Sequence, residues 1–405
     1  MGRPFRLLVM DIRWPPETFL ERKLRALAAA GIDVTVLTTG PGAGEEAGGV
    51  RVWRVRSGWR GLAAATRLFL RALLRAPVPT LAGTLRLRSR ARGGALWKLL
   101  VRHWAVEAAD PDVTHFEWTL AAAPALPLME DPARRFTVSC RGAHVSIAPW
   151  NDRRLAENRA LNGVFEKCVA VHCVSNAILE EACALGMRRE KAAVIRPAVE
   201  APGSEARPQC VQKGRLRIGM TGSLIWRKAV EHALVALRRA VDEGLDTKMV
   251  VMGGADKENR ARFLYTVQDL GLEGRVDWKG AVRAEEVMEV LRGCDVFLLS
   301  SLSEGISNAV LEAMSCGLPV VVTEAGGMRE AVRDGVEGFV VPVRDVEAMA
   351  EALVKLGRDP ELRRRMGEAG RRRVMEEFTL ERQTREWRAF YERAAVGFAG
   401  ADVAG

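Results

Sequence analysis

The chain has 405 residues, of which 48% are hydrophobic and 28% are charged, and its formal net charge is +10. This length excludes a single hydrophobic core and favours two or three domains, and the composition is that of a soluble globular protein. No apolar run reaches 18 residues and no secretory leader precedes the first strand-like run, so we expect neither a membrane-spanning helix nor a signal peptide.

Strand-like and helix-like runs alternate along the first half of the chain. The first helix-like run ends at Gly31, a residue type that favours helix C-termini. Such alternation predicts a parallel sheet with helices on both faces. The expected strands are 6–11, 34–37, 50–55, 113–116, 136–139, 169–174 and 194–196, and the expected helices include 17–30, 62–75 and 94–109.

A strongly basic segment spans residues 47–106. It contains thirteen Lys or Arg residues, no Asp or Glu, and four of the ten tryptophans. Arg67, Arg71 and Arg75 recur every four residues and therefore line one face of the expected helix. Basic amphipathic helices near Trp are typical of anionic membrane surfaces, and a solvated arginine-rich face is the alternative. No nucleic-acid-binding motif accompanies the charge, so we expect no nucleic-acid partner.

Proline, glycine and charge interrupt the alternation at about 198–214, which predicts an interdomain linker. We therefore expect an N-terminal domain over 1–205, a second domain over 206–378 and a C-terminal helix over 379–405. The seven cysteines form no Cys-x-x-Cys pair and lie mostly in apolar runs, so we expect reduced core residues. Strand-like runs in the second half are 217–221, 248–252, 276–278, 296–300, 320–322 and 339–341, and helix-like runs include 228–243, 284–292, 360–377 and 380–394.

Seven residues separate Glu304 from Glu312, where an apolar strand-like run gives way to a helix-like run. The intervening backbone N–H groups would lie at a helix N-terminus, where an anion is favoured. A carboxylate can accept hydrogen bonds from hydroxyl groups, and the neighbouring amides can hold a phosphate. This combination suits a nucleotide-sugar. The alternative for Glu312 is a position on a solvated helix face.

The segment 304–324 resembles the donor-site signature of the family-4 retaining glycosyltransferases, enzymes of the GT-B fold. The shared features are the two glutamates, a glycine after the first, and then Glu-Ala-Met-x-Cys-Gly-x-Pro-Val-Val. The resemblance implies an α/β protein with two Rossmann-like, doubly wound domains that face a cleft. It also implies that Glu304 contacts the donor sugar, that Glu312 holds the ribose hydroxyls, and that the last helix crosses back to the N-terminal domain. The loop residues implied to approach sugar and diphosphate are Gly305, Ile306, Ser307 and Asn308.

A glycine-containing turn follows the first strand of the second domain. The family pattern there is Gly-Arg-Leu, three further residues and Lys-Gly, of which this chain keeps Gly222, Leu224 and Lys228. The resemblance implies that Lys228 supplies positive charge to the diphosphate and acts with Glu304 in catalysis. Ser223 replaces the family's Arg and Ala229 replaces its Gly, so the neighbouring Arg227 is the alternative second cation.

Further positions match family motifs less closely. Val282 falls in a stretch that resembles the base-binding segment. Glu17 and Thr18 resemble the entrance of polysaccharide-type members, and a role as a helix cap would explain them equally well. Arg141 takes the place of the family's His and His144 that of its Asp, so Arg141 would bind phosphate or steady a leaving group rather than act as a base. His115 would line the cleft or lie in the core.

These features predict a retaining, metal-independent hexosyltransferase that moves a sugar from a UDP- or GDP-sugar to a saccharide or lipid-linked acceptor. Surface polysaccharide or glycolipid biosynthesis would be its setting, in the cytoplasm or at the inner face of the cytoplasmic membrane. We expect no cofactor and no metal ligands, since the nucleotide-sugar is a substrate. The alternatives are a nucleotide-sugar epimerase of the same fold and a catalytically silent binding scaffold.

Overall fold

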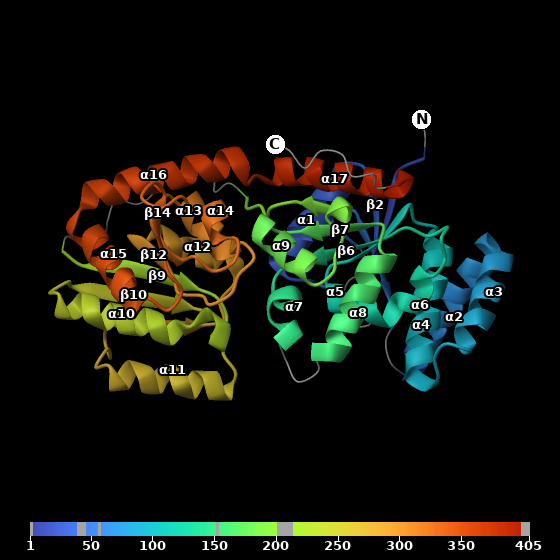
Figure 1. Ribbon diagram of the computed structural model, residues 1–405, viewed down its shortest axis with the longest axis horizontal. Coiled ribbons are helices and arrows are strands. Elements are labelled where there is room, and N and C mark those ends of the chain that lie inside the picture. Colours follow the sequence, from blue (N-terminus) through green and yellow to red (C-terminus); the bar gives the residue numbers. More distant parts are fainter. Residues whose placement is uncertain (1–2, 39–45, 56–57, 151–153, 201–213, 398–405) are drawn as a thin grey trace. The chain divides into compact units, whose positions relative to one another are not determined.

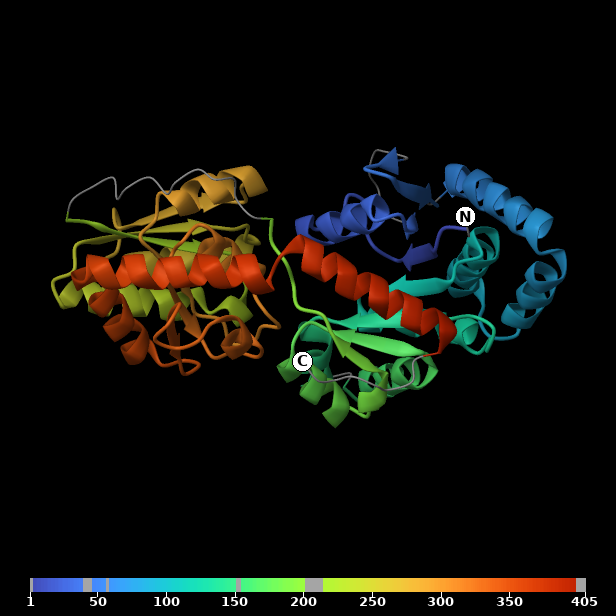
Figure 2. The same ribbon diagram turned by 90° about the horizontal axis from the view of Figure 1, so that it is seen from above.

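The computed structural model of the protein describes residues 3–38, 46–55, 58–150, 154–200 and 214–397. Two compact units divide the chain (Figures 1 and 2). Unit 1 consists of Met1–Ile195 and Glu381–Gly405, and unit 2 of Arg196–Leu380. The expected linker at 198–214 lies largely outside the described residues.

Unit 1 is built on an eight-stranded sheet with the order β3-β4-β2-β1-β5-β6-β7-β8, in which only the β3–β4 pair is antiparallel. Side chains alternate between its faces, so that Leu7 and Val9 enter one buried cluster and Leu8 and Met10 the other. The strands are β1 Arg6–Met10, β2 Asp33–Thr38, β3 Glu46–Ala47, β4 Val50–Arg54, β5 Val113–Phe116, β6 Phe136–Cys140, β7 Ala170–Cys173 and β8 Ala192–Val194.

Helices cover both faces of this sheet. One face packs against α1 (Thr18–Ala29) and α17 (Leu380–Val396), the helix drawn in red in Figure 2. The expected helices 17–30, 62–75 and 94–109 form, and α3, which begins at Pro77, is a further helix that was not predicted. Proline is tolerated in a first helical turn, where no intrahelical N–H bond is lost. The helices on the other face are α2 Gly58–Arg75, α3 Pro77–Arg88, α4 Gly93–Ala109, α5 Thr119–Ala122, α6 Leu126–Met129, α7 Ala143–Ser146, α8 Arg154–Lys167 and α9 Asn176–Ala184.

Unit 2 has a six-stranded, fully parallel sheet with the order β11-β10-β9-β12-β13-β14. Two buried clusters lie on its two faces, and α16 contributes to both of them. Its strands are β9 Leu216–Thr221, β10 Thr247–Met252, β11 Val276–Gly280, β12 Val296–Leu299, β13 Val320–Thr323 and β14 Gly338–Val341. Its helices are α10 Val230–Asp242, α11 Lys257–Asp269, α12 Ala284–Arg292, α13 Asn308–Ser315, α14 Met328–Ala331, α15 Val346–Arg358 and α16 Pro360–Glu377.

The predicted α/β class with two Rossmann-like domains is confirmed by these two sheets. The expected start of a helix at Lys228 is wrong. Ala229 has left-handed backbone angles (φ 46°, ψ 47°), so α10 begins only at Val230 and Lys228 belongs to a short 3₁₀ turn, Trp226–Lys228. Among the described helices, none combines the length and apolar character that crossing a bilayer requires. The six described cysteines are free, and all but Cys183 are buried.

Each sheet has one point where the strand order reverses. In unit 2, β9 pairs with β10 on one side and with β12 on the other. In unit 1, β1 pairs with β2 and β5 in the same way. In open parallel sheets, ligands bind outside the carboxyl ends of the strands at such a reversal. The loops that follow β9, β12, β1 and β5 are therefore the expected ligand-binding loops.

Candidate active site

Lys228 and Glu304 form an ion pair at the reversal point of unit 2. Lys228 lies in the segment that follows β9, and Glu304 in the loop that follows β12. The ammonium of Lys228 donates to Oε1 of Glu304, and the hydroxyl of Ser301 donates to the same oxygen at 2.7 Å. The two charged side chains retain 16% and 10% of their exposure, so both are partly buried yet still reachable by a ligand. The structure thus brings together the two residues for which the sequence suggested a catalytic role.

Hydrogen bonds tie the β9 and β12 loops to each other. The hydroxyl of Ser300 donates to the carbonyl oxygens of Lys228 and Ala229, at 3.0 and 2.8 Å. The N–H of Leu302 donates to the carbonyl of Arg227 at 2.7 Å. The left-handed conformation of Ala229 explains the glycine of the family pattern, since a residue without Cβ adopts it at no steric cost. These bonds fix the backbone from which Lys228 reaches Glu304.

A third loop, which follows β13, packs closely against the backbone of Glu304. Gly326 has φ +56°, and a Cβ placed on it would lie 1.8 Å from the carbonyl oxygen of Glu304. The N–H of Gly327 donates to Gly305 at 2.7 Å, and the hydroxyl of Thr323 donates to Ser301 at 2.5 Å. Only glycine at position 326 therefore permits this approach.

Gly253, after β10, has a similar role that sequence reasoning missed. A Cβ there would lie 1.9 Å from the carbonyl oxygen of Gly222, the expected diphosphate-loop glycine. The N–H of Gly222 in turn donates to Met252 at 2.9 Å. The signal was available, because Gly253 and Gly254 directly follow a predicted strand of the same sheet.

Helix α13 begins directly after the Glu304 loop. Ser307 occupies its N-cap position without a side-chain capping bond, and Oδ1 of Asn308 is buried without a hydrogen-bond partner. The first N–H groups of any helix lack partners within it, so this terminus presents donors near Glu304. Glu312 is the fifth residue of α13 and is half-buried. It lies just over one turn into the helix.

The remaining donor candidates are spread around this edge. Gly305 and Ile306 are buried in the Glu304 loop, whereas Ser223 is exposed and Arg227 is half-buried. Val282 follows β11, the edge strand, and is half-buried against one of the two apolar clusters of unit 2. These positions share the carboxyl edge of the sheet, with Val282 farthest along it from β12.

In unit 1, Arg141 pairs with a buried carboxylate that sequence reasoning did not single out. Glu117 follows β5 and is fully buried, and its two oxygens accept from Lys23 and Arg141. Burial alone would raise the pKa of Glu117, but the adjacent cations Lys23 and Arg141 hold it well below its usual value. Arg141 also donates to the Glu117 carbonyl at 3.3 Å and lies 5.1 Å from the ring of Phe19. Its guanidinium is therefore held in one place at the carboxyl end of β6.

The other N-terminal candidates occupy different environments. His115 is fully buried in the core, with Nδ1 2.8 Å from Thr137 Oγ1 and Nε2 3.1 Å from Ser139 Oγ. Nδ1 of His144 accepts from the N–H of Leu120 at 3.3 Å. Glu17 stands at the N-cap position of α1, but its side chain makes no capping bond. Thr18 and Glu17 are both exposed. Of these residues, His144 and the Glu17–Thr18 pair keep the accessibility that an acceptor site needs.

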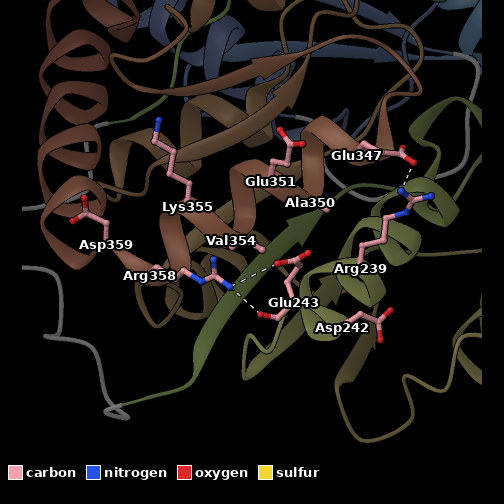
Figure 3. A pocket seen from close by; sticks show the side chains of 10 residues that line it. All are labelled: Arg239, Asp242, Glu243, Glu347, Ala350, Glu351, Val354, Lys355, Arg358 and Asp359. Atoms are coloured by element: carbon pink, nitrogen blue, oxygen red, sulfur yellow. Dashed lines mark hydrogen bonds and ion pairs between the residues drawn. The ribbon is translucent and has the colours of Figure 1, made fainter.

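A hollow of about 740 Å³ lies elsewhere, between α10 and α15 (Figure 3). Two contacts join charged residues of its lining: Arg239 pairs with Glu347, and Arg358 donates to the Glu243 carbonyl at 2.9 Å. Glu243 follows α10 and precedes β10, which puts it at the amino edge of the sheet, opposite the Lys228–Glu304 pair. The hollow is therefore separate from the candidate active site.

Comparisons with known proteins identify the family and the fold. Residues 205–373 match the family described as Glycosyl transferases group 1, and residues 16–201 match Glycosyltransferase Family 4. The chain is 33% identical to N-acetyl-alpha-D-glucosaminyl L-malate synthase of Bacillus anthracis over 40% of its own length and 42% of that protein. It is 27% identical to 2-deoxystreptamine glucosyltransferase of Streptomyces kanamyceticus over 92% of its length and 97% of that protein.

A solved structure shares the fold over nearly the whole chain. HepE of Anabaena, in complex with UDP-glucose, superposes with a TM-score of 0.73 at 16% identity, covering 96% of this chain and 99% of that one. The most similar curated relatives, by contrast, are matched over less than half of their own length. The two family matches together span most of the chain, and the chain belongs to the group 1, family 4 glycosyltransferases of the GT-B fold.

Proposed function

We propose that this protein is a retaining glycosyltransferase that takes a hexose from a nucleotide-diphosphate donor. The observation that carries the proposal is the Lys228–Glu304 pair at the strand-order reversal of unit 2, beside the N-terminus of α13. The UDP-glucose held by the HepE structure supports a nucleotide-sugar as the donor class. UDP- and GDP-sugars remain the two candidate donors, since backbone contacts near Val282 would leave no side-chain signature of the base.

In the proposed reaction, the ammonium of Lys228 and the N–H groups at the start of α13 hold the negative charge of the departing diphosphate. Fixed cations and amides can stabilise such charge without a metal ion, because they are already oriented before the reaction. Glu304 and Glu312 accept hydrogen bonds from hydroxyls of the sugar and ribose. The acceptor hydroxyl attacks on the face from which the diphosphate leaves and passes its proton to the leaving phosphate. Glu304 then serves as a binding and orienting group, not as a nucleophile.

We assign the acceptor to unit 1, as a saccharide or a lipid-linked sugar of surface polysaccharide or glycolipid biosynthesis. Arg141, His144, Glu17 and Thr18 are the candidate contacts. Glu117 is shared by Arg141 and Lys23, so the cluster keeps one net positive charge, and we expect the fixed Arg141 guanidinium to orient an acceptor group that accepts hydrogen bonds.

We further propose that the protein works in the cytoplasm at an anionic membrane surface, to which the basic segment 47–106 is attracted. The segment carries thirteen positive residues and no negative ones. Each Lys or Arg near an anionic leaflet contributes about 1 kcal/mol at physiological salt. The attraction should weaken as salt is added.

Replacement of Glu312 tests the donor site. Glu312→Ala removes a carboxylate–hydroxyl pair and should weaken nucleotide-sugar affinity by about 1.5–3 kcal/mol, measured by titration calorimetry. Glu347→Ala, on the opposite edge of unit 2, is the matched control and should leave the affinity unchanged. Equal affinities for all three proteins would refute the assignment.

Turnover assays separate the proposed reaction from its two alternatives. With donor alone, an epimerase would release free nucleotide and an epimerised sugar. A silent scaffold would be stabilised against melting by the nucleotide but would consume none of it. A transferase releases the nucleotide at a rate that rises with acceptor and yields a product of unchanged anomeric configuration.

A further inference from the structure

Helices α2 and α3 of unit 1 present large apolar side chains to solvent. Leu74 is 87% exposed, Val78 is 73% exposed and Leu85 is 66% exposed. Three further residues, Leu62, Leu70 and Leu81, are exposed by about half. An isolated exposed leucine is ordinary, but six exposed large apolar side chains on two consecutive helices are more apolar surface than soluble proteins usually leave uncovered in one region. We call these six residues the leucine patch.

The packing of α3 against α4 keeps the leucine-patch residues of α3 exposed to solvent. Val78, Leu81 and Leu85 share one helical face, and the buried residues Thr80, Gly83 and Leu87 share the opposite face. The buried face is closely fitted to α4: a Cβ on Gly83 would lie 2.3 Å from Cε1 of His103, and Trp104 Nε1 donates to Thr84 at 3.0 Å. Because α3 cannot roll on α4 without breaking this fit, its second apolar face stays in solvent.

Exposed arginines lie beside the patch. Arg71 directly follows Leu70 on α2, Arg67 lies one turn before Arg71 on the same helix, and Arg86 and Arg88 follow Leu85 on α3; all four are exposed. Within the described ranges these four have no carboxylate partner, whereas Arg75 pairs with Asp110 at 2.9 Å. The arginine face predicted from the sequence is therefore partly neutralised at its C-terminal end and free elsewhere.

The combination of charge and apolar surface identifies what covers the patch. In a symmetric contact between two copies, the same surface meets itself, so the arginines would face arginines with no acidic residue of 47–106 to separate them. An anionic bilayer instead supplies negative headgroups at the level of the arginines and an apolar interior for the leucines. Helices α2 and α3 are consecutive in the chain and both pack against α4 (Figure 1), which keeps their exposed apolar residues on one part of unit 1.

We infer that α2 and α3 form a monotopic membrane anchor in which the leucine patch enters the headgroup–acyl boundary and Arg67, Arg71, Arg86 and Arg88 contact anionic headgroups. This inference deepens the membrane location proposed above and rests on it, but it does not depend on sugar transfer. It adds that apolar insertion, and not charge attraction alone, holds the protein to the membrane.

Vesicle sedimentation of the full chain tests the anchor. The vesicles are phosphatidylcholine alone or an equal mixture with phosphatidylglycerol, at low salt and at about 0.5 M salt, where charge attraction is screened. We expect L74S/V78S/L85S to bind mixed vesicles about tenfold more weakly than the unaltered protein or worse, even at low salt. The matched control L264S/Y265S alters two exposed side chains on α11 of unit 2 and should bind as the unaltered protein does. Unchanged melting temperatures verify folding.

Two results would overturn the inference. If L74S/V78S/L85S binds as the unaltered protein does while R67Q/R71Q does not bind, charge attraction alone is responsible. If the unaltered protein ignores every vesicle and light scattering finds a dimer that L74S/V78S/L85S converts to monomers, a second copy covers the patch. Leucine-dependent binding by a protein without sugar-transfer activity would leave the anchor standing and refute only the proposed reaction.

Discussion

The ammonium of Lys228 donates to the carboxylate of Glu304 at the point where the strand order of unit 2 reverses. The two residues are separated by 75 others in the chain, and each comes from a loop fixed by neighbouring backbone: Ser300 binds the Lys228 loop, and Gly326 lies against the carbonyl of Glu304. An ion pair that is partly buried but still accessible can exchange its partners for a ligand that carries both hydroxyls and phosphate.

Lys228→Ala should reduce donor affinity and kcat/KM together. It removes the cation assigned to the diphosphate, and the loss of a charged hydrogen bond is about 1.5–3 kcal/mol, or roughly ten- to hundredfold. Steady-state kinetics over a range of donor concentrations measures it. Arg227→Ala tests the alternative cation and, if Lys228 makes the diphosphate contact, should change kcat/KM by less than about threefold. Equal losses in the two variants would mean that general positive charge, and not the position of Lys228, matters.

Gly326→Ala should damage the site through the backbone. The new Cβ would collide with the Glu304 carbonyl, so the Glu304 loop must move and donor affinity should fall. Gly271→Ala is a matched control, because Gly271 has φ +59° but no neighbour within 4 Å. We expect about 1–2 kcal/mol of lost stability from backbone strain in both variants, and a larger loss with weakened donor binding only for Gly326→Ala. Denaturant unfolding and calorimetric titration provide the two measurements, and intact donor binding in Gly326→Ala would contradict the geometry.

Glu117→Gln should destabilise unit 1 strongly. It leaves Lys23 and Arg141 without their shared carboxylate in a buried environment, which costs about 3–5 kcal/mol. Glu21→Gln breaks the solvent-exposed pair with Arg25 and should cost less than about 1 kcal/mol. Hydrogen exchange of unit 1 peptides in increasing denaturant distinguishes the two. A loss below about 1 kcal/mol for Glu117→Gln would show that the cluster relaxes or admits water.

The stability of unit 1 should fall between about pH 6.5 and pH 4. Burial lowers the pKa of His115 to about 4, with Glu117 opposing the shift and Lys23 and Arg141 adding to it. Thr137, Ser139, Trp387 and Tyr391 complete its surroundings. The unfolded chain therefore binds more protons than the folded one in this window, so the free energy of unfolding rises with pH. The contribution of His115 is complete above pH 6.5, at most about 3 kcal/mol, and is lost as the pH falls to about 4.

Unfolding midpoints measured from pH 4 to pH 7 check the sign and the source of this dependence. His115→Gln should flatten the curve, with the remaining slope due to His172, whose pKa burial also lowers well below its usual value, and to the carboxylates. An identical slope in the variant would assign the dependence to other groups.

Buried parallel strands could be predicted because they are continuous apolar runs, and β12 and β13 lie within a residue or two of their expected bounds. The order of those strands could not, since apolar patterns do not encode which strands pair. Lys228 and Glu304 could therefore be named from motifs, but their contact required the topology. The left-handed conformation of Ala229 was missed because alanine prefers right-handed helical angles, and α3 was missed although Pro77 at its first position is compatible with a helix start. Glu117 was missed because its partner Lys23 lies 94 positions away.

The return of the chain to unit 1 through α17 affects the order of folding during synthesis. The ring of Trp387 lies 4.3 Å from that of His172, and the Lys23 ammonium lies 4.0 Å from the Trp387 ring. The part of the first sheet that α17 covers is therefore exposed until α17 is made. All of unit 2 is translated before that helix, which delays it by about ten seconds or more at ordinary rates of protein synthesis. Unit 2 can therefore reach its native state first. Unit 1, although most of it is synthesised earlier, is complete only after α17 has been made.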